Sequence, residues 1–77
     1  MIQILLFANL KDQAGAEKVV VDAKELTVKE LLQILQEKHS LTNLEQVMVA
    51  VNEEYSTSED LVKSGDTVAL IPPVSGG

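Results

Sequence analysis

Hydrophobic and polar positions along this chain predict four strands and one long helix. The run 2–8 is apolar at nearly every position, which favours a central strand with protein against both of its faces. β-Branched residues over 18–21 predict the second strand of a hairpin. Two further strands are expected over 47–51 and 67–71. The last strand should end at Pro72, because proline cannot donate a hydrogen bond to a neighbouring strand.

The clearest helix signal begins at Thr27. Thr27 and Glu30 have the spacing of a capping box, in which each side chain satisfies a backbone N–H at the start of a helix. Leu26 and Leu31 have the spacing of a hydrophobic staple around that cap. Positive charge in the last turn, near His39, is favourable for the helix dipole. The apolar stripe of this helix consists of Val28, Leu31, Leu32 and Leu35.

The segments between these elements are polar. Residues 9–15 end in glycine and are interpreted as a loop or a single helical turn. Polar turns are expected over 52–54 and 64–66. The segment 58–61 is interpreted as the start of a short helix, with Ser58 as its cap. These elements form one α+β domain over 1–73, in which one main helix packs on one face of a four- to five-stranded sheet.

One helix covers only one face of such a sheet. Alternation along the strands assigns to the covered face Ile4, Leu6, Val49, Val51, Val68 and Leu70. It assigns to the other face Gln3, Leu5, Phe7, Met48, Ala50, Thr67, Ala69 and Ile71. Four of these, which we call the apolar patch, are Leu5, Phe7, Met48 and Ile71. An apolar patch on a small protein is typical of a protein interface, and a loop folded over it is the alternative.

Composition narrows the classes of function. The chain has 77 residues, 45% of them hydrophobic, and no cysteine, so disulfides and thiolate chemistry are excluded. A net charge of -6 disfavours nucleic acid and suits a basic protein partner, although solubility alone explains it equally well. The apolar run 2–8 is too short to span a membrane and lacks the basic flank of a signal peptide. We therefore expect a cytoplasmic protein that has no membrane partner.

No catalytic group is evident within the domain. His39 is the single histidine and is interpreted as a helix-end residue. The acidic pairs at 53–54 and 59–60 lack the spacing of a calcium loop, so no metal site is expected. The group that a partner can single out is the carboxylate of Gly77.

Residues 74–77 are interpreted as a flexible tail. Pro72 and Pro73 stiffen the exit from the domain, and Gly76 and Gly77 carry no side chain that would hinder entry into a narrow channel on another protein. A frayed terminus is the alternative. The carboxylate needs activation, most simply as an acyl-adenylate made by a separate ATP-using enzyme. Sulfide or a persulfide then gives a thiocarboxylate, whereas a lysine amine gives an isopeptide conjugate.

Several short motifs together resemble a known family. They are Leu6-Phe7-Ala8, Ala50-Val51-Asn52, Gly65-Asp66 and the ending Pro72-Pro73-Val74-Ser75-Gly76-Gly77. The chain resembles the small subunits of molybdopterin synthase, in the ubiquitin-like sulfur-carrier family, over its whole length. This resemblance implies a β-grasp fold, a mixed sheet with the first and last strands side by side at its centre.

The resemblance also implies partners and site residues. An E1-like enzyme would adenylate Gly77 with ATP, and a sulfur donor protein would then supply the sulfur of a thiocarboxylate. This chain itself would bind no cofactor. The tail Val74, Ser75, Gly76 and Gly77 would enter the large subunit of a heterotetrameric synthase, which holds the active site. Sulfur would pass there to a cyclic pyranopterin monophosphate in molybdenum cofactor biosynthesis.

The large-subunit contacts implied by the resemblance are Phe7, Tyr55, Ile71, Pro72 and Pro73. In some relatives the residue before the diproline is aromatic, whereas here it is Ile71, so details of the interface packing differ. Three alternatives stay open: a sulfur carrier of the thiamin branch, a protein modifier that conjugates to lysines, and a ubiquitin-like binding module.

Overall fold

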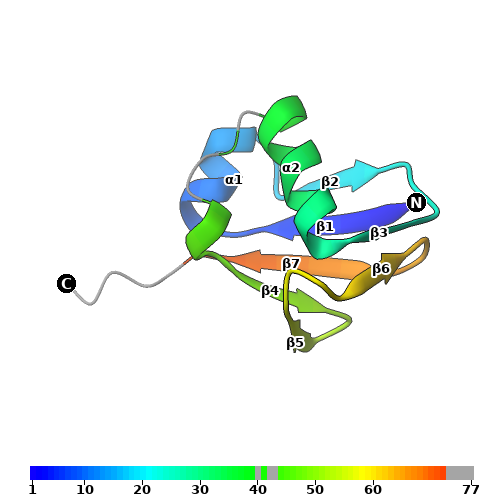
Figure 1. Cartoon of the computed structure of the whole chain (residues 1–77). Helices are drawn as coiled ribbons and strands as arrows, with labels where there is room; N and C mark the ends of the chain where they lie inside the picture. Colours follow the sequence, from blue (N-terminus) through cyan, green and yellow to red (C-terminus); the bar gives the residue numbers. More distant parts are fainter. Residues whose placement is uncertain (40, 42–43, 73–77) are drawn as a thin grey trace.

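The structure is a computed structural model, and it describes residues 1–39, 41 and 44–72. Within these residues it contains a five-stranded sheet, a two-stranded sheet and two α-helices (Figure 1). The elements in chain order are β1 (Ile2–Leu6), α1 (Ala8–Ala14), β2 (Lys18–Val21), β3 (Glu25–Thr27), α2 (Val28–His39), the 3-10 helix η1 (Leu44–Gln46), β4 (Met48–Val51), β5 (Glu54–Ser56), β6 (Leu61–Lys63) and β7 (Thr67–Ile71).

The larger sheet has the strand order β2-β1-β7-β4-β5. The first and last strands, β1 and β7, pair in parallel at its centre, with Ile4 opposite Val68 and Leu6 opposite Leu70. The other pairings in this sheet are antiparallel. The mixed sheet with its first and last strands side by side is therefore confirmed.

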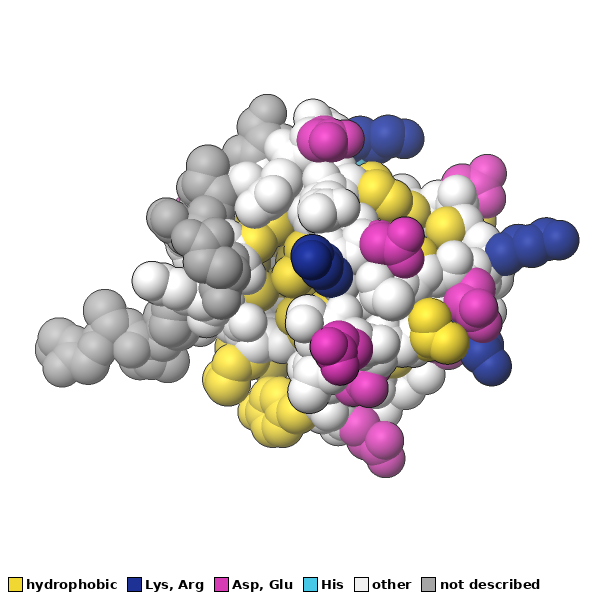
Figure 2. Space-filling model, in the orientation of Figure 1, with side chains coloured by type: hydrophobic (Ala, Val, Ile, Leu, Met, Phe, Trp, Pro, Cys, Tyr) yellow, Lys and Arg dark blue, Asp and Glu magenta, His cyan; other side chains and the backbone are white. Residues whose placement is uncertain are grey.

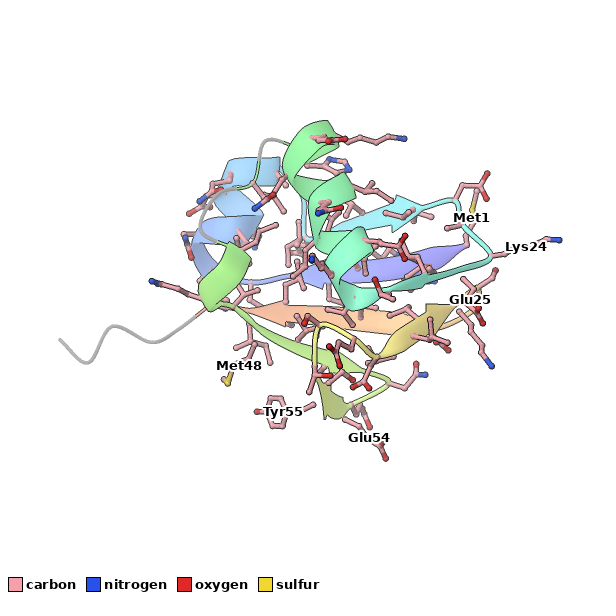
Figure 3. The ribbon with its side chains drawn as sticks, viewed as in Figure 1. Met1, Lys24, Glu25, Met48, Glu54 and Tyr55 are labelled. Carbon is pink, nitrogen blue, oxygen red and sulfur yellow. The ribbon has the colours of Figure 1, made fainter. Side chains whose placement is uncertain are left out.

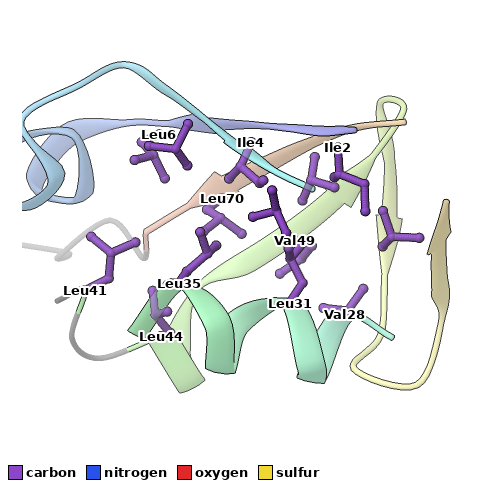
Figure 4. Packing of buried hydrophobic residues seen from close by; sticks show 14 of the residues in the cluster. Ile2, Ile4, Leu6, Val28, Leu31, Leu35, Leu41, Leu44, Val49 and Leu70 are labelled. Atoms are coloured by element: carbon purple, nitrogen blue, oxygen red, sulfur yellow. The ribbon is translucent and has the colours of Figure 1, made fainter. Parts of the chain in front are cut away.

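The core lies between this sheet and the two helices, which are on the same side of it (Figures 1 and 4). Leu31 and Leu35 point from α2 toward the sheet and are fully buried. The sheet side of the core includes Ile2, Ile4, Leu6, Val49, Val68 and Leu70. The predicted covered face is thus confirmed, except that Val51 is only half-buried. Burial of these aliphatic side chains is the main favourable term in folding.

The predicted capping box forms at the start of α2. The Thr27 backbone N–H donates to a Glu30 carboxylate oxygen over 2.9 Å, and the Glu30 backbone N–H donates to the Thr27 hydroxyl over 3.1 Å. These hydrogen bonds lower the pKa of Glu30. Leu26 and Leu31 are both buried in the core, as the staple spacing predicted.

The predicted short helix at 58–61 is wrong. The Asp60 carboxylate accepts from the Thr57 backbone N–H over 2.8 Å, which holds this segment in a turn, and β6 begins at Leu61. The carbonyls of Asp60 and Ser58 accept from the first two backbone N–H groups of α2, each over 3.0 Å. The segment therefore satisfies the otherwise free donors of α2 instead of forming a helix.

The segment 9–15 is also more helical than predicted. It belongs to a seven-residue helix, α1, which is held to the core by buried Leu10. Gly15 ends this helix in the left-handed conformation, with φ of 73°, and donates its N–H to the Lys11 carbonyl. Three strands of three residues each, β3, β5 and β6, were not predicted.

Hydrogen bonds around Asp66 join two turns at one end of the sheet. The Asp66 carboxylate accepts from the Lys63 backbone N–H over 2.8 Å and from the Asn52 side-chain amide over 3.0 Å. The Asn52 side-chain carbonyl in turn accepts from the Thr67 backbone N–H over 3.0 Å. Donation from Lys63, and then from Asn52, lowers the pKa of Asp66 below its ordinary value of 3.8.

We predict that Asp66→Asn makes the free energy of unfolding depend less on pH in the acid range. Because the folded state lowers this pKa, the ionised carboxylate contributes stability above about pH 3.8, and that contribution is lost as the pH falls through the lower folded value. Asp66→Asn should therefore lower the urea midpoint at pH 7, and the difference from wild type should shrink near pH 2.5. The control is Asp12→Asn, at an exposed carboxylate in α1. A difference that does not change with pH would contradict this role.

Candidate functional site

The candidate site lies at the end of the sheet where β1 and β7 finish and β4 begins. Met48 of β4 pairs with Ile71 of β7, and Phe7 directly follows Leu6, the residue of β1 that pairs with Leu70. Phe7 and Met48 are large apolar residues with 46% and 48% of their surface exposed, and Ile71 is half-buried. The register therefore brings three members of the apolar patch into one row.

A second row lies one step further into the same face. It runs across four strands through Leu5, Ala69, Ala50 and Tyr55, which pair in register. The small side chains of Ala50 and Ala69 leave a shallow hollow of about 420 Å³ beside Leu5. Ala50 itself is only 8% exposed, although it lies on the predicted open face.

The exposure of Phe7 and Met48 bears on the alternative that a loop covers the patch. The part of the chain that the structure describes leaves about half of the surface of each residue open to solvent. Figure 2 shows exposed hydrophobic side chains gathered at this end of β4 and β5. Contact with a partner would remove this apolar surface from water.

Tyr55 lies at the outer edge of this face, on β5, and is 73% exposed. Figure 3 shows its ring beside the Met48 side chain, whereas Phe7 directly follows β1, which lies beyond β4 and β7 in the strand order. Pro72 follows Ile71 and is half-buried. The other predicted site residues, Pro73, Val74, Ser75, Gly76 and Gly77, lie outside the described residues, so their roles stay predictions.

A hollow beside Phe7 was missed by the sequence analysis. It measures about 570 Å³ and is lined by Leu5, Leu6, Phe7, Ala8, Lys11, Glu17 and Lys18. The Lys11 ammonium lies 3.3 Å from a Glu17 carboxylate oxygen in a surface ion pair. Ala8 turns the chain into α1 with φ of 53°, a conformation that costs most residues about 1 kcal/mol. Lys11 reaches this site only because 9–14 forms a helix, which the sequence signal did not indicate.

The chemistry of this site is that of a contact surface. Its exposed atoms are mostly apolar, and lysine ammonium groups lie at one side of it. Within the described residues, no group of three or more His, Asp or Glu side chains is placed to hold a metal ion. No helix of the described chain has the length and apolar character needed to cross a membrane. His39 is the last residue of α2, as expected.

Comparisons with known proteins agree with the fold. The model of the ThiS family matches residues 4–77. A molybdopterin synthase sulfur carrier subunit from Dictyostelium discoideum is 38% identical, with 97% of this chain and 94% of that protein aligned. SAMP1 from Haloferax volcanii, a small archaeal modifier protein, has a TM-score of 0.86 and 31% identity over 99% of this chain and 98% of its own.

A second solved structure contains a partner. It is the complex of subunits 1 and 2 of the molybdopterin-converting factor from Helicobacter pylori, in which the matching chain has a TM-score of 0.69 and 31% identity. The match covers 99% of this chain and 97% of that one. These likenesses confirm the ubiquitin-like β-grasp fold.

We predict that neighbouring residues of β4 differ sharply in their effect on stability. Met48→Thr should change the free energy of unfolding by less than about 1 kcal/mol, because Met48 is half exposed and threonine suits a strand. Val49→Ala should cost about 2 kcal/mol, because Val49 is 6% exposed and lies in the core. Urea unfolding measures both. Equal losses would show that Met48 is part of the folded core and not of a free surface.

Proposed function

Because the chain belongs to the ThiS family, we propose that it is the sulfur-carrier small subunit of a molybdopterin synthase. The observation that carries this proposal is the exposed row of Phe7, Met48 and Ile71 at the end of the sheet where β7 leads into the Pro-Pro-Val-Ser-Gly-Gly ending. A partner that binds this row is placed to receive the residues that follow Pro72. The name of the Dictyostelium relative and the two-subunit complex from Helicobacter support this reading.

The proposed chemistry takes place at the carboxylate of Gly77. An E1-like enzyme transfers AMP from ATP to this carboxylate and releases pyrophosphate. The terminal sulfur of a persulfide on a donor protein then displaces AMP, and a second thiol cleaves the resulting acyl disulfide, which leaves a thiocarboxylate on Gly77 and a disulfide on the donor side. In the large subunit the thiocarboxylate sulfur bonds to a carbon of the cyclic pyranopterin monophosphate, and water then cleaves the resulting thioester, so that the sulfur stays on the precursor and Gly77 returns to a carboxylate.

The length of the tail limits where this transfer occurs. Four residues, from Val74 to Gly77, reach at most about 13–14 Å when extended. The reacting carbon therefore acts only about that far from Pro73, and the partner must be docked closely against the domain. The apolar patch, immediately beside Pro72, supplies a contact surface at the required position.

Two other functions are known for this fold, and each can be distinguished by the product that it forms. The likeness to SAMP1, with the higher TM-score of 0.86, favours a protein modifier as the second candidate. A thiamin-branch sulfur carrier is the third. Mass spectrometry of the cellular protein separates the first two, because a carrier exchanges a terminal oxygen for sulfur whereas a modifier appears as adducts on lysines of other proteins.

The decisive experiment is reconstitution with the thiocarboxylated protein. With the matching large subunit it should convert the pyranopterin precursor, and with thiazole synthase it should give no thiazole. The reverse result would assign the chain to the thiamin branch. A chain that is active with neither enzyme and is found conjugated to lysines would be a modifier.

Deletion of Gly76 and Gly77 should abolish sulfur transfer and leave the melting temperature nearly unchanged. The physical reason is that the core cluster of the described residues, from Ile2 to Leu70, is built from side chains of the strands and helices, and the two glycines have no side chain to add to it. Ser75→Ala, which keeps both glycines, is the control and should retain transfer. A large fall in melting temperature would show that the tail packs on the domain.

Phe7→Glu should weaken binding of the large subunit by about 2 kcal/mol or more, as expected for a central apolar contact. Val20→Glu is the matched control, because Val20 is equally exposed, at 47% against 46%, and pairs with Gln3 toward the other end of the sheet. It should change binding by less than about 0.5 kcal/mol. Calorimetry measures both, and equal effects would mean that the partner does not bind at the patch.

A further inference from the structure

One side of β2 is an open edge of the larger sheet. β2 lies at one end of the strand order and pairs with β1, and within the described chain no strand lies against its other side (Figure 1). The opposite edge strand, β5, has three residues, whereas β2 has four, and neither proline nor glycine interrupts residues 16–24. Such an edge presents N–H and C=O groups that can pair with another strand.

The pairing with β1 shows which main-chain groups face this edge. The Leu6 N–H donates to the Glu17 carbonyl over 2.8 Å, so the main-chain groups of Glu17 face β1. Successive residues of an antiparallel strand direct these groups to opposite sides. The groups of Val19 therefore face β1 as well, whereas the N–H and C=O groups of Lys18 and Val20 point away from the sheet.

The side chains along this edge are apolar at the centre and oppositely charged at the two ends. Val20 pairs with Gln3 and has 47% of its surface exposed. Lys18 comes two residues before Val20 and Asp22 two residues after it, and both are exposed. A lysine on an edge strand usually prevents further pairing. Here a second copy of the same strand, running antiparallel, carries a carboxylate at the position that faces this lysine.

We propose that two copies of this chain pair through antiparallel β2 strands, with Val20 opposite Val20. This register places Lys18 of each copy opposite Asp22 of the other, and it brings together the outward-facing main-chain groups of both strands. Opposite charges and β-branched side chains are stabilising cross-strand pairs. A shift of one copy by two residues would place Val20 opposite either Lys18 or Asp22 and would remove both ion pairs, so the charges select a single register.

This pairing is compatible with the proposed large-subunit surface. The two-fold axis of the dimer is perpendicular to the sheet, so the two sheets join into one with all helices on the same side. Because the paired strands are antiparallel, β7 finishes at opposite ends of the joined sheet in the two copies. Lys18 borders the hollow beside Phe7, but Ile71 and Met48 lie on strands further from this edge. Each copy therefore keeps an apolar patch that a large subunit can reach.

The contact is small, and the dimer should form only in concentrated solution. A pairing of one short strand buries much less than the roughly 1,600 Å² of a standard interface, so we expect a dissociation constant of about 0.1–1 mM. Sedimentation of the full chain should give the mass of one chain well below this concentration and approach that of two chains above it. The amide signals of Lys18 and Val20 should shift over the same range.

A sample that mixes isotope-labelled and unlabelled chains tests the register directly. In the proposed pairing Val19 of one copy lies opposite Val21 of the other, in a pair without hydrogen bonds, where the two backbones approach most closely. A nuclear Overhauser effect is therefore expected between the α-protons of Val19 and Val21 of different copies. Its intensity should increase with the dimer fraction.

Two charge variants test the ion pairs. Lys18→Glu alone and Asp22→Lys alone each place like charges opposite one another, and each should weaken self-association by about tenfold or more. An equal mixture of the two variants restores both opposite-charge pairs and should associate about as strongly as the unchanged chain. The matched controls are Lys29→Glu on α2 and Asp12→Lys on α1, which make the same charge changes at exposed positions outside β2 and should not alter self-association.

Four results would overturn the proposal. They are a single-chain mass at every concentration, a mixture of the two charge variants that stays monomeric, concentration-dependent shifts confined to Phe7 and Met48, and shifts at Val20 that require addition of the large subunit. The third result would place self-association on the apolar patch, and the fourth would assign the edge to the large subunit. None of these measurements involves Gly77, so failure here leaves the sulfur-carrier proposal intact.

Discussion

The parallel pairing of β1 with β7 is the constraint on which the rest of the structure depends. It joins the two ends of the chain at the centre of the sheet, in register from Gln3 opposite Thr67 to Leu6 opposite Leu70. Because the pairing is parallel, both strands finish at the same end of the sheet. Phe7, which follows β1, is therefore placed beside the point where the chain leaves β7. A contact surface and the start of the tail are brought together by one pairing that is also part of the core.

How far the sequence predicted the fold depends on the range of the interactions involved. The capping box at Thr27 and Glu30 is contained within four residues, so the pattern alone was sufficient to find it. The alternation in β1, β4 and β7 likewise predicted the covered and open faces. The short strands β3 and β6 exist because they pair with each other, with Leu26 opposite Val62, and three residues carry too little periodicity to reveal that.

The errors share a physical cause. The segment around Ser58 has the composition of a helix start, but its carbonyls accept from α2, which follows β3 far earlier in the chain. The hollow at Lys11 and Lys18 depends on the placement of α1 by buried Leu10. Such contacts between distant segments are not encoded in local patterns. The Gly-Gly ending was recognised from sequence, and the domain adds to it the apolar surface beside which β7 ends.

The open face follows from the size of the chain. Two helices of 7 and 12 residues lie on one side of the sheet, so the apolar residues on its other side lack a second layer within the described chain. Exposed Phe7 and Met48 forgo burial that would stabilise the isolated domain by about 1 kcal/mol or more for each side chain. A partner that bound this face would recover this free energy, and that gain would be a driving force for forming the complex.

Alternation along β4 links the two sides of the sheet. Val49 points into the core, whereas Met48 lies at the row beside Ile71 and also lines a groove next to α2. Tyr55 on β5 likewise pairs with Ala50 of the open face and lines the groove next to α2. A partner on the patch would therefore also cover part of the surface beside α2, because these two side chains border both sides of the β4–β5 edge.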